Sequence, residues 1–153
     1  GNLILVGSML IVTSLLLFIS DKMNDLNKKI RTKSAIIIGI AQAIAILPGI
    51  SRSGSTIAIS LFLGINRDLA AKFSFLMVIP IIVGSSIKMI MYDNLFFEET
   101  ILINYIVGFI SAIISGYFAC KWMIFLVKKS KLIYFSIYCL LVGLISISYS
   151  LMQ

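Results

Sequence analysis

Long apolar runs alternate with short polar segments along the whole chain. The longest runs cover residues 3–20, 69–91, 101–126 and 132–151. Each run is about as long as the helix of ~20 residues that crosses ~30 Å of hydrocarbon. Pro80 lies inside the second run and predicts a kink there. The pattern predicts an all-α, polytopic membrane protein with about four transmembrane helices.

A shorter apolar pattern over residues 34–65 predicts a different element. Apolar arms at 34–47 and 57–65 flank a polar stretch at 48–56. At about 1.5 Å per residue the arms reach only ~21 Å and ~14 Å, too little to cross ~30 Å of hydrocarbon. We therefore expect a re-entrant helical hairpin with its tip at membrane depth, within a single integral-membrane unit over residues 1–153.

The composition excludes an ordinary soluble domain. Of the 153 residues, 60% are hydrophobic and only 12% are charged, against roughly 25% charged in soluble domains. The mean hydropathy is +1.10. Cys120 and Cys139 lie in apolar stretches without CxxC spacing, and the sequence contains no His. These features predict neither a metal cluster nor a disulfide framework.

Charged residues distinguish the two ends of the apolar runs. The net charge of +7 comes from basic residues that gather chiefly at 22–33 and 128–131, whereas Asp93, Glu98 and Glu99 lie in a segment without Lys or Arg. By the positive-inside rule the basic ends are cytoplasmic. The hairpin then enters from the cytoplasm and the C-terminus lies outside. Because this charge pattern sets topology, we expect no nucleic-acid partner.

The ends of the chain and one later run carry further signals. No basic region precedes the first run and no small-residue cleavage site follows it, so it predicts a spanning helix rather than a signal peptide. Because the chain begins at Gly1 within an apolar pattern, we expect an upstream part to be absent. Gly108, Ala112 and Gly116 recur every four residues and predict close packing against another helix.

The polar stretch at 48–56 carries an arginine at membrane depth. A central Arg costs about 2.5–3.5 kcal/mol on insertion scales, so Arg52 indicates function. Pro48 and Gly49 are expected to end the first arm. The second arm is expected to be capped by Ser53, Ser55 or Thr56. Such a helix start leaves backbone N–H groups that attract an anion.

The same stretch supplies donors for a phosphate. Arg52 is expected to act as a permanently charged, bidentate clamp. The hydroxyl groups expected to donate to phosphate oxygens belong to Ser51, Ser53 and Thr56, with Ser55 also at the substrate. Gly49 and Gly54 suit a backbone that turns tightly and approaches a ligand closely. The predicted ligand is an anion attached to a lipid tail. In the alternative interpretation Arg52 binds no ligand and is structural, with its side chain extended to the lipid headgroups.

Two further polar residues lie among apolar neighbours. Gln42 on the first arm predicts either a structural amide that holds the hairpin together or a group that reaches the substrate. Ser74 on the following span is expected to be structural, because such residues usually form hydrogen bonds between helices.

These residues together resemble the undecaprenyl-diphosphate phosphatase family, the bacitracin-resistance proteins. The resemblance is carried by Gly39-Ile40-Ala41-Gln42, by the run from Leu47 to Thr56 with its PGxSRSGxT pattern, by Phe73-Ser74-Phe75-Leu76 and by Ile79-Pro80. It spans most of the chain. The resemblance implies hydrolysis of undecaprenyl diphosphate to the monophosphate, which recycles the carrier lipid for cell-wall synthesis in the bacterial inner membrane and gives bacitracin resistance.

The family is built from two inverted repeats, and this chain resembles the second. The resemblance implies that a divalent cation, Mg or Ca, and its acidic ligands belong to the other repeat, with no metal ligand in this chain. The expected partners are therefore the polyprenyl diphosphate substrate and either the N-terminal repeat or a second copy, including a possible homodimer.

Two other classes of function fit the hairpin less fully. A lipid-phosphate or anion transporter also uses helix ends to hold an anion, but it moves substrate without releasing phosphate. A membrane scaffold without ligand affinity would show no effect of changing Arg52.

Overall fold

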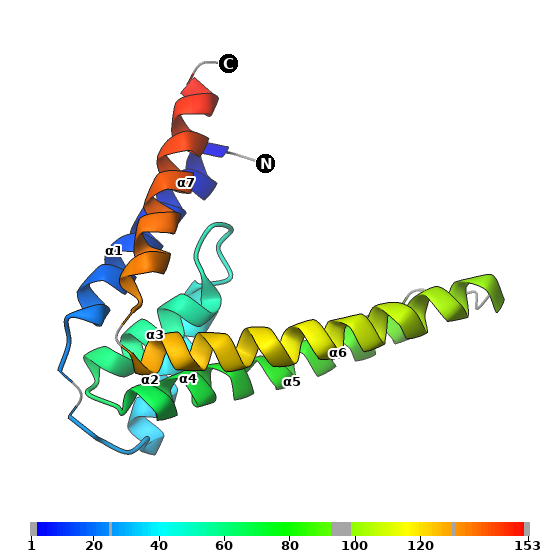
Figure 1. Cartoon of the computed structure of the whole chain (residues 1–153), viewed down its shortest axis with the longest axis horizontal. Helices are drawn as coiled ribbons and strands as arrows, with labels where there is room; N and C mark the ends of the chain where they lie inside the picture. The colour runs from blue at the N-terminus through cyan, green and yellow to red at the C-terminus, as the bar shows by residue number, and fades with distance from the viewer. Residues whose placement is uncertain (1–2, 25, 93–98, 130, 152–153) are drawn as a thin grey trace.

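The computed structural model describes residues 3–24, 26–92, 99–129 and 131–151 (Figure 1). The helices in this part of the chain are α1 (Leu3–Asp21), α2 (Thr32–Ile44), α3 (Arg52–Phe62), α4 (Arg67–Leu76), α5 (Val78–Tyr92), α6 (Glu99–Lys128) and α7 (Ile133–Leu151). Four spans are long and apolar enough to cross a membrane, namely Leu3–Asp21, Arg67–Met91, Ile103–Lys128 and Ile133–Ser150. The predicted all-α membrane fold is therefore confirmed.

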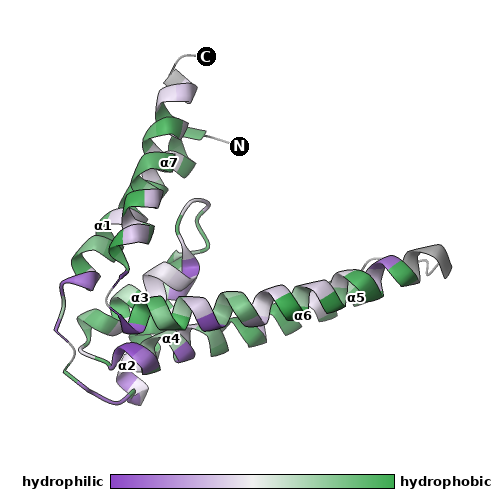
Figure 2. Cartoon of the chain, in the orientation of Figure 1, coloured by the Kyte–Doolittle hydropathy of each residue, from purple (hydrophilic) through white to green (hydrophobic). Residues whose placement is uncertain are grey.

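The helices form two arms that diverge from a shared base (Figure 1). α1 and α7 lie side by side in one arm, α5 and α6 extend in the other, and α2 to α4 lie where the arms meet. Both arms are largely hydrophobic, whereas hydrophilic residues concentrate at the base (Figure 2). The core is also there, with Leu17, Ile38, Ile57 and Leu132 among its buried members.

The arm of α1 and α7 is held by small residues and hydroxyl groups. A Cβ atom on Gly143 would lie 2.9 Å from the carbonyl oxygen of Gly7, so the two backbones approach too closely for a larger side chain. The Ser14 hydroxyl donates to the Ser136 carbonyl oxygen at 2.8 Å, and the Ser136 hydroxyl donates to the Ser14 carbonyl oxygen at 2.8 Å. In lipid, the burial of apolar side chains contributes little free energy to helix association, so such packing and hydrogen bonding hold the helices together.

A buried arginine joins the helices at the base. The Arg67 side chain, in a residue only 8% exposed, donates to the carbonyl oxygens of Asp21 and Met23, both at 2.9 Å. The Asp21 carboxylate in turn accepts the backbone N–H of Leu132 at 3.0 Å. These bonds fasten the end of α1 to the starts of α4 and α7.

A second set of charges joins α4 to α6. Asp68 lies 2.9 Å from the Lys128 ammonium group and 2.7 Å from that of Lys72. The Lys128 contact therefore fastens the start of α4 to the end of α6 at the base.

Pro80 produces the predicted break in the second long span. α4 ends at Leu76 and α5 begins at Val78, with Met77 in a turn between them. Because proline has no N–H, Pro80 cannot donate to the carbonyl of Leu76, and its ring crowds that group. The predicted kink is confirmed and lies one turn before the proline.

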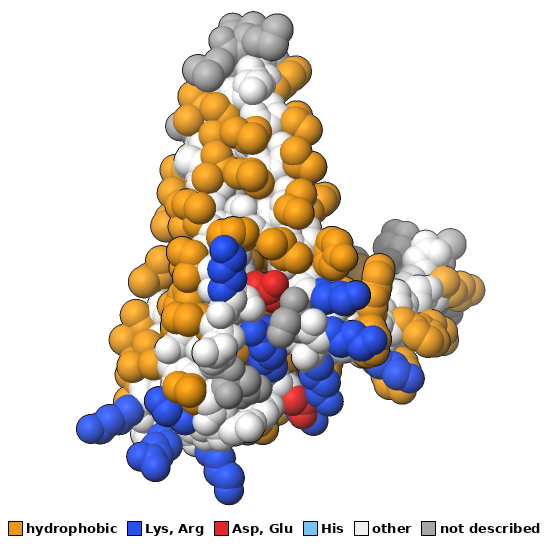
Figure 3. Space-filling view, turned by 60° about the vertical axis from the view of Figure 1, so that its left-hand side comes forward, with side chains coloured by type: hydrophobic (Ala, Val, Ile, Leu, Met, Phe, Trp, Pro, Cys, Tyr) orange, Lys and Arg blue, Asp and Glu red, His pale blue; other side chains and the backbone are white. Residues whose placement is uncertain are grey.

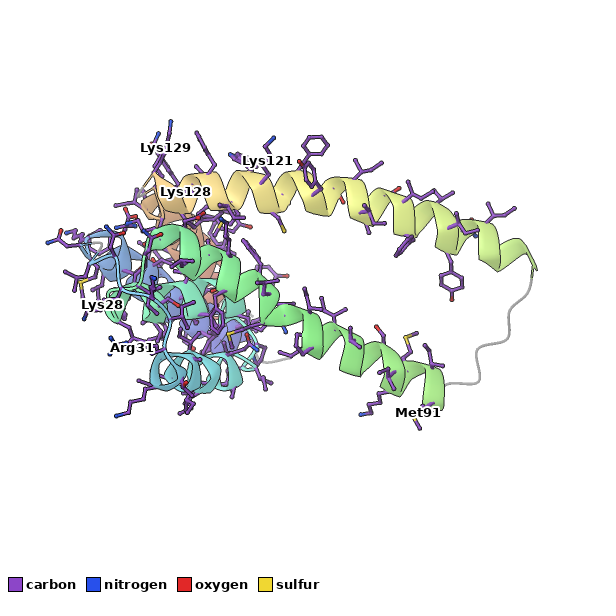
Figure 4. The ribbon with its side chains drawn as sticks, turned by 90° about the horizontal axis from the view of Figure 1, so that it is seen from below. Lys28, Arg31, Met91, Lys121, Lys128 and Lys129 are labelled. Carbon is purple, nitrogen blue, oxygen red and sulfur yellow. The ribbon has the colours of Figure 1, made fainter. Side chains whose placement is uncertain are left out.

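The other arm is open. α5 and α6 make no contact with each other within the described residues, and they separate from the base outward (Figure 4). A Cβ atom on Gly108 or Gly116 would meet nothing within 4 Å. The close packing predicted for these residues is not found against any described helix and stays a prediction, whereas Gly7 and Gly143 do approach closely. The predicted acidic outer segment falls largely on residues 93–98, outside the described residues.

The contact between α1 and α7 gives a test of arm packing. We expect Gly143→Ala to lower stability by ~1–3 kcal/mol, because its methyl group meets the Gly7 backbone. Gly116→Ala is the control: it meets open space, and the better helix propensity of Ala stabilises by up to ~1 kcal/mol. Thermal unfolding in detergent measures both, and equal midpoints would contradict this packing.

Candidate functional site

The turn between α2 and α3 begins before the proline. α2 ends at Ile44, and the chain continues in tight turns in which Leu47 N–H donates to the Ile44 carbonyl at 3.3 Å. Pro48 and Gly49 were expected to end the first apolar segment, residues 34–47. The helix has already ended before them, in the turn at residues 44–47. The proline prevents helix from resuming at once, since it disfavours the α conformation in the residue before it.

Ser51 caps α3, and the helix starts at Arg52. The Ser51 hydroxyl oxygen accepts the backbone N–H of Gly54 at 3.1 Å. The expectation that Ser53, Ser55 or Thr56 caps the second arm is therefore wrong. The second half of the polar stretch forms the first turn of α3, so its polar residues lie inside the helix beside the cap.

Gly49 is needed both for its conformation and for its size. Its φ of +98° belongs to the region that side chains disfavour. A Cβ atom there would lie 2.4 Å from the carbonyl oxygen of Val6 on α1. The predicted tight turn is confirmed, and the close approach that the structure contains is to the α1 backbone. Gly54 lies inside α3, where a Cβ atom would crowd the Ser51 cap at 3.0 Å.

Thr13 on α1 fixes the turn from the other side. Its hydroxyl oxygen accepts the Ser51 backbone N–H at 3.1 Å and its proton goes to the Met9 carbonyl at 3.0 Å. Thr13 is fully buried. Sequence reasoning missed this residue; the signal was a pair of hydroxyl residues, Thr13 and Ser14, inside an otherwise apolar run.

These contacts fix the height of the turn along α1. Thr13 is eight residues from Asp21, the end of α1 at the base, which is about 12 Å along the helix. Val6 is fifteen residues from Asp21, or about 22 Å. The start of α3 therefore lies beside the middle of a membrane-length helix, away from the basic base.

Arg52 and Ser53 remain available at this helix start. Both are partly buried, and neither side chain has an ion pair or hydrogen bond with a described residue. Their backbone N–H groups also have no acceptor in that part of the chain. A fixed positive charge, free helix-end donors and an available hydroxyl thus meet in one place, and such a group can bind an anion.

Two other predicted site residues point elsewhere. Thr56 is 1% exposed, and its hydroxyl donates to the carbonyl oxygens of Arg52 or Ser53, at 3.0 and 3.1 Å. Ser55 is 4% exposed, and its hydroxyl has no partner in the described chain. It lines a cavity of about 160 Å³ with apolar residues of α1, α2 and α3. In this structure both residues belong to the helix interior, so direct contact with substrate stays a prediction.

Gln42 lies toward α4 rather than at the turn. Its amide nitrogen is 3.5 Å from the carbonyl oxygen of Met77, between α4 and α5, and its amide oxygen has no partner among the described residues. This contact favours the structural alternative for Gln42. Ser74 is fully buried, but its hydroxyl also lacks a described partner, so the hydrogen bond between helices that we expected is not found there.

The described residues do not fit a divalent cation. They contain no group of three or more His, Cys, Asp or Glu side chains. The donors beside Arg52 are hydroxyl and carbonyl oxygens next to a positive charge, whereas Mg and Ca sites in proteins use carboxylates. Asp21 and Asp68 are engaged at the base.

Comparison with known proteins decides the family. The family model described as bacitracin resistance protein BacA matches residues 1–145. This chain belongs to the BacA family. It is 50% identical over 153 residues to an undecaprenyl-diphosphatase of Christiangramia forsetii, and 51% identical over 158 residues to one of Bacteroides fragilis. Each comparison covers 100% of this chain.

More distant BacA relatives align over nearly the whole chain as well. An undecaprenyl-diphosphatase of Halothermothrix orenii is 44% identical over 148 residues, which is 93% of this chain. The chain spans less than two thirds of these relatives, namely 58%, 59% and 56% of their lengths.

The BacA-family turn can be tested at Gly49. We expect Gly49→Ala to destabilise the chain by more than ~1 kcal/mol, because it adds a methyl group against Val6 at a positive φ. Gly39→Ala, on α2 with nothing within 4 Å, is the matched control and should be neutral or stabilising. Denaturant unfolding in micelles compares the two, and a harmless Gly49→Ala would mean that the turn does not pack on α1.

Thr13 offers a separate test of the same contact. Thr13→Val keeps the shape but removes the acceptor of the Ser51 N–H, and should cost ~1–3 kcal/mol. Thr13→Ser keeps the hydroxyl and should retain most of the stability. Amide hydrogen exchange at residues 49–53 should speed up in the valine variant only; unchanged exchange would exclude this role for Thr13.

Proposed function

We propose that this chain supplies the diphosphate-binding half of an undecaprenyl-diphosphate phosphatase, which releases phosphate and leaves the monophosphate of the carrier lipid. The observation that carries the proposal is Arg52, unpaired in the described chain and beside the free start of α3. The relatives that carry the name undecaprenyl-diphosphatase support the substrate.

The site lies at a depth that suits a lipid diphosphate. The contacts with Thr13 and Val6 support a re-entrant hairpin over residues 34–65, with its tip near the middle of the bilayer. Exposed apolar residues at the turn, Ile46 and Leu47, are 82% and 47% exposed and suit contact with lipid chains. We propose that the prenyl tail stays in the hydrocarbon while the diphosphate reaches Arg52.

Each polar group has a distinct part in this proposal. Arg52 binds two phosphate oxygens and stabilises the charge that builds up as the phosphoryl group is transferred. The backbone N–H groups of Arg52 and Ser53 and the hydroxyl of Ser53 hold the remaining oxygens. The Ser51 oxygen accepts the Gly54 N–H, so its proton remains able to donate to the substrate.

The nucleophile comes from outside the described residues. Attack on phosphorus needs a positioned nucleophile and charge neutralisation, commonly with a metal. We place these groups, and the Mg or Ca that the family resemblance implies, in the remaining two fifths of the relatives' length. Within the described residues, α5 and α6 do not contact each other and are exposed along most of their length, so such a partner can pack against them (Figure 4). In the cell we expect the inner membrane and a role in peptidoglycan synthesis and bacitracin resistance.

Phosphate release tests the assignment of Arg52. In the full-length protein, Arg52→Ala should reduce turnover of undecaprenyl diphosphate by about 1,000-fold or more, since an arginine at a transferred phosphoryl group contributes about that much. Arg52→Lys keeps the charge but loses the bidentate geometry, and should retain an intermediate rate. Lys129→Ala removes one positive charge at the base, far from the turn, and serves as the control: it should leave turnover unchanged.

The outcomes separate the candidate functions. An active and folded Arg52→Ala variant would exclude Arg52 from phosphate binding. If labelled lipid crosses proteoliposome membranes without phosphate release, the protein is a transporter rather than a phosphatase.

A further inference from the structure

A cavity of about 580 Å³ lies at the base, away from Arg52 and the turn. It is lined by Lys28, Lys29, Ile30, Arg31, Ser34 and Leu63. Lys28 and Arg31 lie together on one side of the base, whereas Lys128 and Lys129 lie across it at the end of α6 (Figure 4). Basic side chains crowd this end of the molecule (Figure 3). The cavity therefore presents three cations in one hollow.

The backbone that carries these cations is held in place. Lys28 N–H donates to the Gly64 carbonyl at 3.1 Å, and its own carbonyl accepts the Asn66 N–H at 3.3 Å. The Asn66 amide also donates to the Asn27 side chain at 2.6 Å. These bonds fasten the segment before α2 to the turn between α3 and α4. The backbone at Lys28 is thus fixed before any ligand arrives, which reduces the entropy lost on binding.

The charges in the cavity lack acidic partners in the part of the chain that the structure describes. Asp21 and Asp68 are engaged with Arg67, Lys72 and Lys128, and no ion pair reaches Lys28, Lys29 or Arg31. α2 also begins here, and its N-cap residue Arg31 offers no side-chain acceptor to the first N–H groups. Cations and helix-end donors together favour a phosphate group.

Apolar surface next to the cavity indicates a lipid as the source of that phosphate. Ile37, Ile40 and Ile44 follow Ser34 at helical spacing on one broad face of α2 and are 45%, 57% and 59% exposed. Ile30 and Leu63 add apolar walls within the cavity. A phosphodiester in the cavity can therefore extend its acyl chains along α2, which inorganic phosphate cannot do.

We infer that this cavity is a binding site for the headgroup of an anionic phospholipid of the membrane leaflet at the base. The site is separate from the one that binds substrate and does not depend on the proposed function. A lipid held here would brace the start of α2, the helix that leads to the turn.

The test counts lipid molecules retained by the purified chain. Native mass spectrometry after addition of phosphatidylglycerol should show one molecule bound per chain, with at least tenfold preference over phosphatidylcholine. Lys28→Gln, Lys29→Gln and Arg31→Gln together should weaken binding on the order of 100-fold, at roughly a fivefold loss for each cation. Helix content from circular dichroism verifies that the variant is folded.

A matched control separates a site from diffuse charge. Lys22→Gln, Lys129→Gln and Lys131→Gln remove the same charge from the same end of the molecule but line no part of the cavity. This triple should change affinity less than about threefold at physiological salt. Equal losses in the two triples would overturn the inference.

Two further measurements complete the test. Lys28→Arg, Lys29→Arg and Arg31→Lys together keep every charge and should retain the lipid; loss of binding would overturn a role for charge. Inorganic phosphate should displace phosphatidylglycerol only at concentrations at least 100-fold higher than the lipid. Displacement at equal concentration would mean a site for free phosphate and not for lipid.

Discussion

The position of the α2–α3 turn against α1 decides what the rest of the chain can do. Away from water, a backbone N–H without an acceptor is costly, and Thr13 accepts the N–H of Ser51. Gly49 permits the contact because only a residue without a side chain fits against Val6. The start of α3 is therefore held at mid-height on a membrane-length helix, with its donors directed into the turn.

The two arginines at the base and at the α2–α3 turn differ in their hydrogen-bond partners. At the base, Arg67 donates to the carbonyl oxygens of Asp21 and Met23, so it acts as a structural link. At the α2–α3 turn, Arg52 has no such partner in the described chain. The same residue type is thus structural in one place and a candidate ligand group in the other, and hydrogen-bond partners make the difference.

The two arms differ in how closely their helices pack. α1 and α7 pack against each other through glycine contacts and hydrogen-bonded serines. α5 and α6 do not touch within the described residues, and their glycines face open space. The chain spans less than two thirds of the length of its BacA-family relatives.

The membrane-length helices, the break near Pro80 and the concentration of basic residues at one end could all be predicted from the sequence. These features depend on whether each short segment prefers water or hydrocarbon, which its own residues decide. No contact with a distant part of the chain is needed to predict them. The PGxSRSGxT run also identified the family that the comparison establishes. The folded chain was needed to show that Ser51 caps α3, that Thr13 holds the turn and that the close glycine pair lies in α1 and α7. Those facts depend on residues far apart in the chain, and periodicity along a single helix carries no information about which partner meets it.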